Sequence, residues 1–329
     1  PVERTSIVHL PDHLPSSIIT SIELNHTVAF IGTSEGQFLK VHIESGLFAR
    51  LYENVALDGN SVMGDTMLSE TTKELYVLTE QKLIKMRVEN CGQYTTCETC
   101  IGTDAGNDGD PYCGWCTLER KCTRYRDCPS PDVSTRWLAY NAAQCIEITR
   151  VAPYDSLPIT VTEQQLTLSI QQLPDLTAWS YECYFGSYAS PATKIDNTLM
   201  CSSPPVDEIP FVEEDDAVTI QLSVYSTETS INLIETDFHF FECSTHSSCV
   251  SCVGSRWACD WCVFEDRCTH ESMTCIGANE IIITGDNNPV TSAKTGPGFC
   301  PQLQNQTAEV LLPNGIARSI TVPTKNLPD

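Results

Sequence analysis

The chain has 329 residues, of which 18 are cysteine, and its 43 acidic against 19 basic side chains give a formal net charge of −24. A charge this negative repels nucleic acid and anionic lipid, so we expect no nucleic-acid partner and attribute the acidity to a soluble surface. Apolar runs stay shorter than the roughly 18 residues of a membrane helix, and residue 1 opens no signal peptide, which predicts an internal piece of a longer secreted or cell-surface protein.

Residues 1–90 contain no cysteine and are predicted to fold into strands. β-Rich runs occur at Thr27–Ile31 and Gln37–Ile43, and again at Leu75–Thr79 and Lys82–Val88, each pair separated by a short turn. Four-stranded meanders of this kind are typical of propeller blades, and this stretch suffices for about two blades of roughly 40–45 residues. Two blades cannot close a ring, so we expect the remaining blades outside this chain.

The turn at Gly32-Thr33-Ser34-Glu35-Gly36 matches the G-x-S-x-G pattern that carries the nucleophile of α/β-hydrolases. That motif needs a strand, a sharp turn and then a helix, so that its serine is exposed above a parallel sheet. The residues that follow, 37–43, have the pattern of a second strand instead. This context favours a hairpin turn, with no catalytic role for Ser34.

Two sets of eight cysteines share nearly the same spacing: C-x5-C-x2-C, a loop, C-x-W-C and a further cysteine after five residues. The first set is Cys91, Cys97, Cys100, Cys113, Cys116, Cys122, Cys128 and Cys145; the second is Cys243, Cys249, Cys252, Cys259, Cys262, Cys268, Cys275 and Cys300. Cys183 and Cys201 lie between the sets. Even counts at repeated spacings in small modules predict disulfides, which persist in an oxidising, extracellular compartment.

Zinc is the first alternative for these cysteines. The pairs Cys97-x2-Cys100 and Cys113-x2-Cys116 approach the spacing of a zinc ribbon, and the second set repeats the arrangement. A zinc ion would leave four further cysteines of each set as free thiols, which are hard to keep in a secreted chain. We therefore favour disulfides and expect no metal and no cofactor.

The segment Cys113-Gly114-Trp115-Cys116 also resembles a thioredoxin-type redox pair. Such a pair works at the N-terminus of a helix that follows a βαβ unit, where the helix dipole lowers the thiol pKa. The surrounding sequence has six other cysteines and no βαβ pattern. A structural knot with the tryptophan as its small core is the better interpretation.

The loop from Ile101 to Tyr112 is rich in Gly, Asp and Asn and is expected to be exposed. Four oxygen donors in it are candidate Ca²⁺ ligands: Asp104, Asn107, Asp108 and Asp110. Their spacing lacks the closing glutamate of an EF-hand, so a solvated turn is favoured. The basic residues of the same module are expected to lie dispersed on its solvent face; they are Arg120, Lys121, Arg124, Arg126 and Arg136.

Residues 146–242 are predicted to form a β-sandwich of immunoglobulin type, held by Cys183 and Cys201. The expected strands include Thr160–Val161, Leu166–Ile170, Val218–Tyr225 and Phe238–Phe241. After the second cysteine set, runs at Ala308–Leu312 and Ser319–Val322 predict further strands.

Two N-x-S/T sequons, at Asn25 and Asn305, fit glycosylation of an extracellular chain.

With the modules in order, a family resemblance follows. The first cysteine set, with Asp110-Pro111-Tyr112-Cys113-Gly114-Trp115-Cys116, resembles a PSI domain; residues 75–91 resemble the final blade of a sema propeller and 146–242 an IPT domain. The duplicated PSI module makes the order similar to that of plexins. The resemblance implies a mainly β chain: 1–90 C-terminal sema blades, 91–145 first PSI, 146–242 first IPT, 243–300 second PSI and 301–329 the start of a second IPT.

Eight cysteines allow 105 pairings, so the pairing rests on the resemblance alone. In the first module it implies Cys91–Cys113, Cys97–Cys145, Cys100–Cys122 and Cys116–Cys128. In the second it implies Cys243–Cys259, Cys249–Cys300, Cys252–Cys268 and Cys262–Cys275, with Cys183–Cys201 in the sandwich.

The resemblance also implies a function. Plexins are single-pass receptors for semaphorins that guide axons and migrating cells, and their semaphorin contacts lie mainly on earlier sema blades. This segment is therefore expected to be a non-enzymatic stalk on the extracellular side of the plasma membrane, attached through a membrane segment outside this chain. Homo-association of ectodomains is a further candidate interaction. The alternative is a secreted or matrix adhesion module that does not signal.

Overall fold

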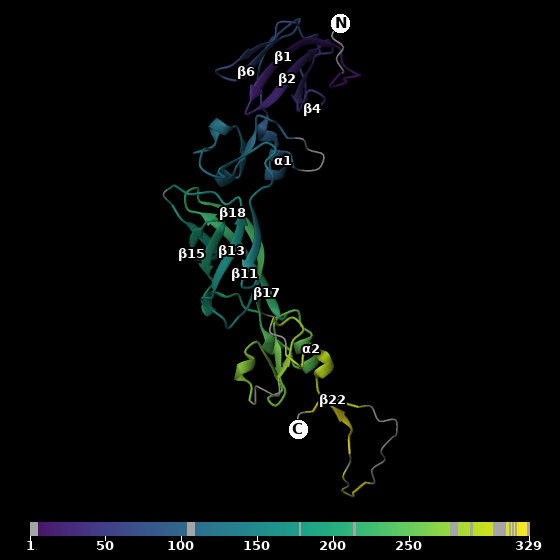
Figure 1. Cartoon of the computed structure of the whole chain (residues 1–329), viewed down its shortest axis with the longest axis vertical. Coiled ribbons are helices and arrows are strands. Elements are labelled where there is room, and N and C mark those ends of the chain that lie inside the picture. Colours follow the sequence, from purple (N-terminus) through teal and green to yellow (C-terminus); the bar gives the residue numbers. More distant parts are fainter. Residues whose placement is uncertain are drawn as a thin grey trace.

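The computed structural model describes residues 6–103, 109–177, 179–212, 215–276, 282–289, 292–304, 314–315, 317, 319 and 321–327. They form a row of β-rich modules, from the N-terminal strands through two small cysteine modules with a sandwich between them (Figure 1). Among these residues, no helix has the length and apolarity needed to cross a membrane. Seven short 3-10 helices lie in the described part: Cys91–Gln93, Thr117–Glu119, Tyr125–Asp127, Val206–Glu208, Cys243–Thr245, Ser272–Thr274 and Pro297–Phe299.

The first sheet is a four-stranded antiparallel meander, as predicted. Its strands are β1 (Pro15–Glu23), β2 (His26–Thr33), β3 (Gln37–Ile43) and β4 (Ala49–Ala56), in that spatial order. Ser34 lies in the turn between β2 and β3, so the hairpin interpretation of the glycine-rich motif is confirmed. The sheet is covered on both faces, because β2 alternates between two apolar clusters, one containing Phe30 and the other Ile31.

The second sheet contains β5 (Met67–Ser69), β6 (Glu74–Leu78) and β7 (Leu83–Arg87). The β6–β7 hairpin is the predicted one, but the sheet has three strands among the described residues where a four-stranded meander was expected. A single bridge, between Val62 and Thr79, stands in place of a further strand. Leu75 and Val77 from β6 share an apolar core with Phe30 and Phe38 of the first sheet.

The two cysteine modules repeat one plan. In the first, α1 (Cys97–Ile101) packs on a three-stranded sheet of β8 (Gly114–Cys116), β9 (Lys121–Thr123) and β10 (Trp137–Ala139). In the second, α2 (Cys249–Val253) packs on β19 (Asp260–Cys262), β20 (Arg267–Thr269) and β21 (Ile282–Thr284). Each helix begins at a hydroxyl cap, Thr96 or Ser248, whose oxygen accepts a backbone N–H of the first turn.

The module between them is a sandwich of eight strands. They are β11 (Glu147–Ala152), β12 (Ser156–Pro158), β13 (Gln165–Gln171), β14 (Tyr181–Phe185), β15 (Tyr188–Ile195), β16 (Thr198–Ser202), β17 (Ala217–Ser226) and β18 (Ile231–Phe241). Strand β15 changes partner along its length, pairing with β14 through residues 188–192 and with β16 through 193–195. This change of partner links two layers, whose inward side chains, among them Leu168, Leu222 and Phe238, form one core.

Two strand predictions were wrong. Thr160–Val161 lies in a turn after β12, where the Val161 N–H donates to the Pro158 carbonyl at 3.0 Å. The described residues of Ser319–Val322 are irregular, and a short β23 (Thr324–Lys325) pairs instead with β22 (Gln302–Leu303). A β-rich run becomes a strand only where a neighbouring segment pairs with it, and the propensity of the run alone does not secure that pairing. The run Ala308–Leu312 lies outside the described residues.

Candidate functional site: the joints between modules

Nine disulfides account for all 18 cysteines, and their partners are those that the family resemblance implies. They join Cys91–Cys113, Cys97–Cys145, Cys100–Cys122, Cys116–Cys128, Cys183–Cys201, Cys243–Cys259, Cys249–Cys300, Cys252–Cys268 and Cys262–Cys275. Cys113 and Cys116 are thus bonded to Cys91 and Cys128 and not to each other. This arrangement contradicts a thioredoxin-type pair.

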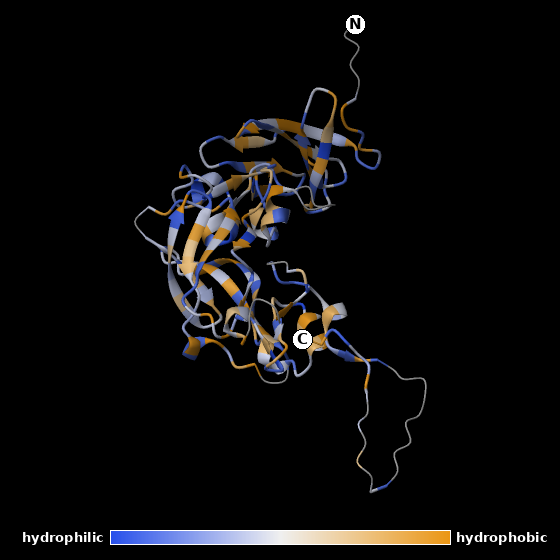
Figure 2. Cartoon of the chain, turned by 60° about the horizontal axis from the view of Figure 1, so that its bottom comes forward, coloured by the Kyte–Doolittle hydropathy of each residue, from blue (hydrophilic) through white to orange (hydrophobic). Residues whose placement is uncertain are grey.

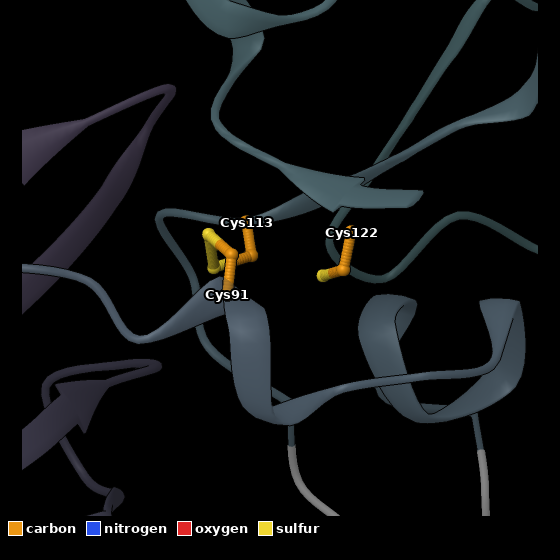
Figure 3. A group of neighbouring side chains, drawn as sticks. All are labelled: Cys91, Cys113 and Cys122. Carbon is orange, nitrogen blue, oxygen red and sulfur yellow. A yellow bond between two sulfur atoms is a disulfide. The ribbon is translucent and has the colours of Figure 1, made fainter. Parts of the chain in front are cut away.

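Three sulfurs lie together at the centre of each cysteine module. In the first module they belong to Cys91, Cys113 and Cys122, within 4.8 Å of one another (Figure 3). Cys91 and Cys113 are bonded to each other, and Cys122 is bonded to Cys100. Thiolates, and not disulfide sulfurs, bind zinc, so the oxidised cluster does not fit a metal. The cluster acts as the compact centre of the module.

Two of the five basic residues predicted to lie on the solvent face are buried instead. Arg124 is 5% exposed and Arg136 is 2% exposed, whereas Arg120, Lys121 and Arg126 are exposed. A buried guanidinium needs charged and hydrogen-bonding partners to offset its lost hydration. Both arginines find those partners in a neighbouring module. Ion pairs of buried arginines therefore connect the first cysteine module to the modules on either side of it.

The contact between the N-terminal sheets and the first cysteine module, here called the upstream joint, is centred on Tyr112. This side chain is 1% exposed and belongs to the apolar core of the sheets, with its ring centroid 6.2 Å from that of Phe30. Arg124 adds two ion pairs at 3.8 Å, to Glu23 of β1 and to Glu89 after β7. One residue from the cysteine loop thus fills the core of another module.

Asp110 fixes the backbone at the upstream joint. Its carboxylate accepts the N–H of Asn90 at 3.0 Å and the N–H of Tyr112 at 2.9 Å, and the residue is fully buried. Burial raises the pKa of Asp110 to about 6, although the charge of Lys40 opposes this rise. The expectation of a solvated turn was therefore wrong for Asp110, because packing against the sheet outweighs the polar composition of the loop. Asp104, Asn107 and Asp108 lie outside the described residues.

Tyr140 closes a second side of the upstream joint. The rings of His26 and His42 meet it edge-on, with centroids 5.1 and 5.5 Å away, and Arg50 donates a hydrogen bond to its hydroxyl. Burial, with smaller contributions from the charges of His26 and Arg50, lowers the pKa of His42 to about 4. At neutral pH this histidine is uncharged, so the joint contains a neutral aromatic cluster beside its ion pairs.

The downstream joint, between the first cysteine module and the sandwich, is a clamp around Arg136. Its two terminal nitrogens donate to both carboxylate oxygens of Glu228 at 2.6 and 2.7 Å, and its Nε donates to the Asp175 carbonyl at 2.8 Å. A two-point arginine–carboxylate contact fixes distance and orientation together. Burial of Leu118 within the sandwich core adds an apolar contact to the clamp.

Sequence reasoning missed this clamp. Arg136 and Glu228 are 92 residues apart, and neither lies in a motif. Arg136 was assigned to the solvent face because isolated basic residues usually lie there. Strand pairing makes Ile282 the equivalent of Trp137, since each pairs with the last cysteine of its C-x-W-C motif. The second module therefore has Ile281 where the first has Arg136, so comparison of the two modules gives no signal either.

The joint between the sandwich and the second cysteine module has a different basis. Strand β18 runs directly into the second module, and Phe241 at its end stacks on Trp257, with ring centroids 5.3 Å apart and planes 1° apart. His246 pairs with Asp216 at 3.3 Å, and Thr160 contacts His270 at 3.1 Å. Aromatic packing therefore replaces the arginine clamp at this end.

Family models match the chain in three places. The plexin repeat (PSI) matches residues 90–146, the TIG domain of plexins matches 155–241, and the PSI domain of plexins A and B matches 249–275. Plexin-A4 of Danio rerio is 33% identical over 322 residues, which cover 95% of this chain and 16% of that protein. Plexin-A2 of Homo sapiens is 31% identical over 334 residues, covering 100% of this chain and 16% of that protein.

A solved structure agrees with these matches. The full extracellular region of plexin A4, domains 1 to 8, is similar at a TM-score of 0.73 and 31% sequence identity, covering 98% of this chain and 31% of that one. The chain thus spans about one sixth of the length of the curated relatives it matches. Since plexin-type modules match in succession and the similarity extends over nearly all of its residues, the chain belongs to the plexin family.

Proposed function

We propose that this chain is the extracellular stalk segment of a plexin-type cell-surface receptor for semaphorins. In this role it sets the distance and angle between a ligand-binding propeller and the membrane during axon guidance and cell migration. The observation that carries the proposal is the Arg136 clamp, together with Tyr112 in the core of the sheets. A ligand can shift a receptor between two states only through contacts that differ between those states. Rigid joints between modules allow a change at the propeller to reach the membrane.

The division of the chain into modules is part of the proposal. We assign 1–90 to sema blades, 91–145 and 243–300 to PSI modules, 146–242 to an IPT sandwich and 301–329 to the start of another. The matched ranges 90–146, 155–241 and 249–275 support these boundaries. Limited proteolysis tests them: cleavage is expected near the module boundaries, and preferred cleavage within a module would contradict the division.

The nine disulfides and the glycan sites belong to the same proposal. Peptide mapping under non-reducing conditions is expected to recover the nine pairs, and free thiols or bound zinc would contradict them. Asn25 is exposed in the tight turn between β1 and β2, with a positive φ of 68°, and is accessible to an oligosaccharyltransferase. Asn305 lies outside the described residues. Site occupancy follows from mass spectrometry before and after enzymatic deglycosylation.

A cell-based experiment tests the stalk role. We would express the full-length protein that contains this chain, as wild type and as Glu228→Ala, with Lys121→Ala as an exposed control. The account expects equal semaphorin binding for all three and a weaker cellular response for Glu228→Ala alone. An unchanged response, at equal surface expression, would contradict the stalk role. Failure of the wild type to bind any semaphorin would favour the adhesion alternative.

We assign no catalytic activity to the chain. The matched regions of the relatives are extracellular plexin segments, and Ser34 donates its hydroxyl hydrogen to Glu35 in an exposed hairpin turn. A Ser34→Ala variant is expected to leave any esterase background unchanged. Loss of a measurable esterase activity in this variant would overturn the assignment.

A further inference from the structure

A groove at the downstream joint has the chemistry of a ligand site. It has a volume of about 770 Å³ and is lined by Ser134 and Thr135 of the first cysteine module and by residues of the sandwich. Asp175 forms part of its wall and also accepts the Nε–H of Arg136 through its carbonyl. The two sides of the groove therefore belong to modules that the clamp holds in a fixed relation, so the groove is preorganised.

Trp179 supplies an apolar platform in this groove. Its side chain is 62% exposed, whereas Trp115, Trp257 and Trp261 are 6%, 6% and 3% exposed. Tryptophan has the largest apolar surface of any side chain together with one N–H donor, and it is enriched at sites where proteins bind partners. Because the Trp179 side chain is exposed to water in this groove, a ligand that covers it would gain the hydrophobic free energy of burying it.

Most of the other lining residues are polar and nearly balanced in charge, although Leu173, Leu176, Tyr181 and Ala192 also line the groove. Hydroxyl groups come from Thr135, Ser180 and Thr193, and Asn197 offers an amide. Such groups both donate and accept hydrogen bonds. The ammonium group of Lys194 is already paired with Asp175 at 2.5 Å.

These features select the class of ligand. The paired lysine leaves the carboxylate of Asp196 as the remaining charge on the wall, which disfavours polyanions. Drug-like apolar ligands prefer sites lined mainly by hydrophobic side chains, whereas polar residues are the majority in the lining of this groove. A sugar has an apolar C–H face and a rim of hydroxyls that donate and accept. We propose that the groove binds a neutral oligosaccharide, with Trp179 stacking on a sugar face and Asp196 and Asn197 holding its hydroxyls. The proposal does not depend on the stalk role.

Saturation-transfer NMR and calorimetry test the proposal on the enzymatically deglycosylated chain. The probes are a released oligomannose-type N-glycan and, as the anionic comparison, a heparin-derived tetrasaccharide. We expect saturable binding of the neutral glycan, and affinity reduced roughly tenfold or more by Trp179→Ala, as for other tryptophan anchors. Phe211→Ala is the matched control, because Phe211 is 85% exposed in the same module but does not line the groove. Trp179→Phe is expected to restore part of the affinity.

Each outcome of this experiment is decisive. If the added glycan binds more weakly before deglycosylation than after it, a glycan of this chain competes for the groove. This result supports the site and identifies the chain's own glycan as a ligand. Equal uptake supports the site and points to glycans on other molecules. Binding that is undetectable at millimolar glycan, or that Trp179→Ala leaves unchanged, would overturn the proposal. So would heparin binding that is equally tight and equally dependent on Trp179.

Discussion

Gly114 and Asp260 occupy the same position in the two C-x-W-C motifs, and each is fixed by its own surroundings. A Cβ on Gly114 would lie 2.3 Å from ring atoms of Trp137 and 2.6 Å from the Leu138 carbonyl. Asp260 instead accepts the N–H of Gly285 at 3.2 Å and the side-chain amide of Asn288 at 3.0 Å. The two modules share a disulfide plan and most core positions. The surroundings of this one motif position differ, so Gly114 and Asp260 are not interchangeable.

Gly114→Ala is therefore expected to destabilise the first cysteine module. Because the added methyl group meets a ring and backbone that cannot both move away, overpacking should cost about 1–3 kcal/mol. Gly92→Ala is the matched control, since a Cβ there meets nothing within 4 Å. Chemical denaturation of the whole chain measures both variants, and equal stability of the two would contradict this account of the Gly114 position.

Removing one partner of the Arg136 clamp should be costly. Arg136→Met leaves the Glu228 carboxylate without its charged partner, for which we expect a loss of about 3 kcal/mol in unfolding free energy. The double variant Arg136→Met with Glu228→Met should recover most of this loss, because apolar packing can replace a buried ion pair. Lys121→Met, an exposed change in the same module, is the control. A double-mutant cycle with no coupling between Arg136 and Glu228 would contradict the clamp.

The stability contributed by Asp110 should depend on pH. The pKa of Asp110 is about 6 in the folded chain, against an ordinary value of 3.8. Between about pH 4 and pH 6 the folded state therefore holds a proton that the unfolded state has released, so the contribution falls as pH rises through this range. Below about pH 4 and above about pH 7 it is constant.

Asp110→Asn checks this direction. We would measure unfolding free energies of the wild type and the variant from pH 4 to pH 7.5. The difference, wild type minus variant, is expected to fall as pH rises from about 4 to 6 and then to level off. A difference that rises over the same range would mean that Asp110 is stabilised in its charged form, contrary to the burial argument.

The disulfides should differ in importance. Replacing Cys183 and Cys201 by Ala opens a loop with a sequence separation of 18, for which we expect a loss of about 3 kcal/mol but a folded sandwich. Replacing Cys100 and Cys122 should unfold the first cysteine module, because its small core consists largely of cysteines. Calorimetry of both double variants checks this contrast. Equal losses in the two modules would contradict it.

The parts of the structure that could be predicted from sequence have local signals. The spacing of the cysteines predicted two equivalent modules, and β-rich runs separated by short turns predicted β2, β3, β6 and β7. The joints could not be predicted, because they join residues far apart in the chain. The composition of the loop before Tyr112 predicts exposure, and only the core of the neighbouring sheets explains why both Asp110 and Tyr112 are buried.

The central claim is that the first cysteine module and the sandwich move as one unit. Pulsed electron–electron double resonance measures this directly. One spin label replaces Lys121 and another replaces Gln165, both of which are exposed. The labels are attached through residues other than cysteine, so that the disulfides stay intact. We expect one narrow distance distribution in the wild type and a broader one in Arg136→Met. A broad or two-peaked distribution in the wild type, or a distribution that Arg136→Met leaves unchanged, would contradict the claim.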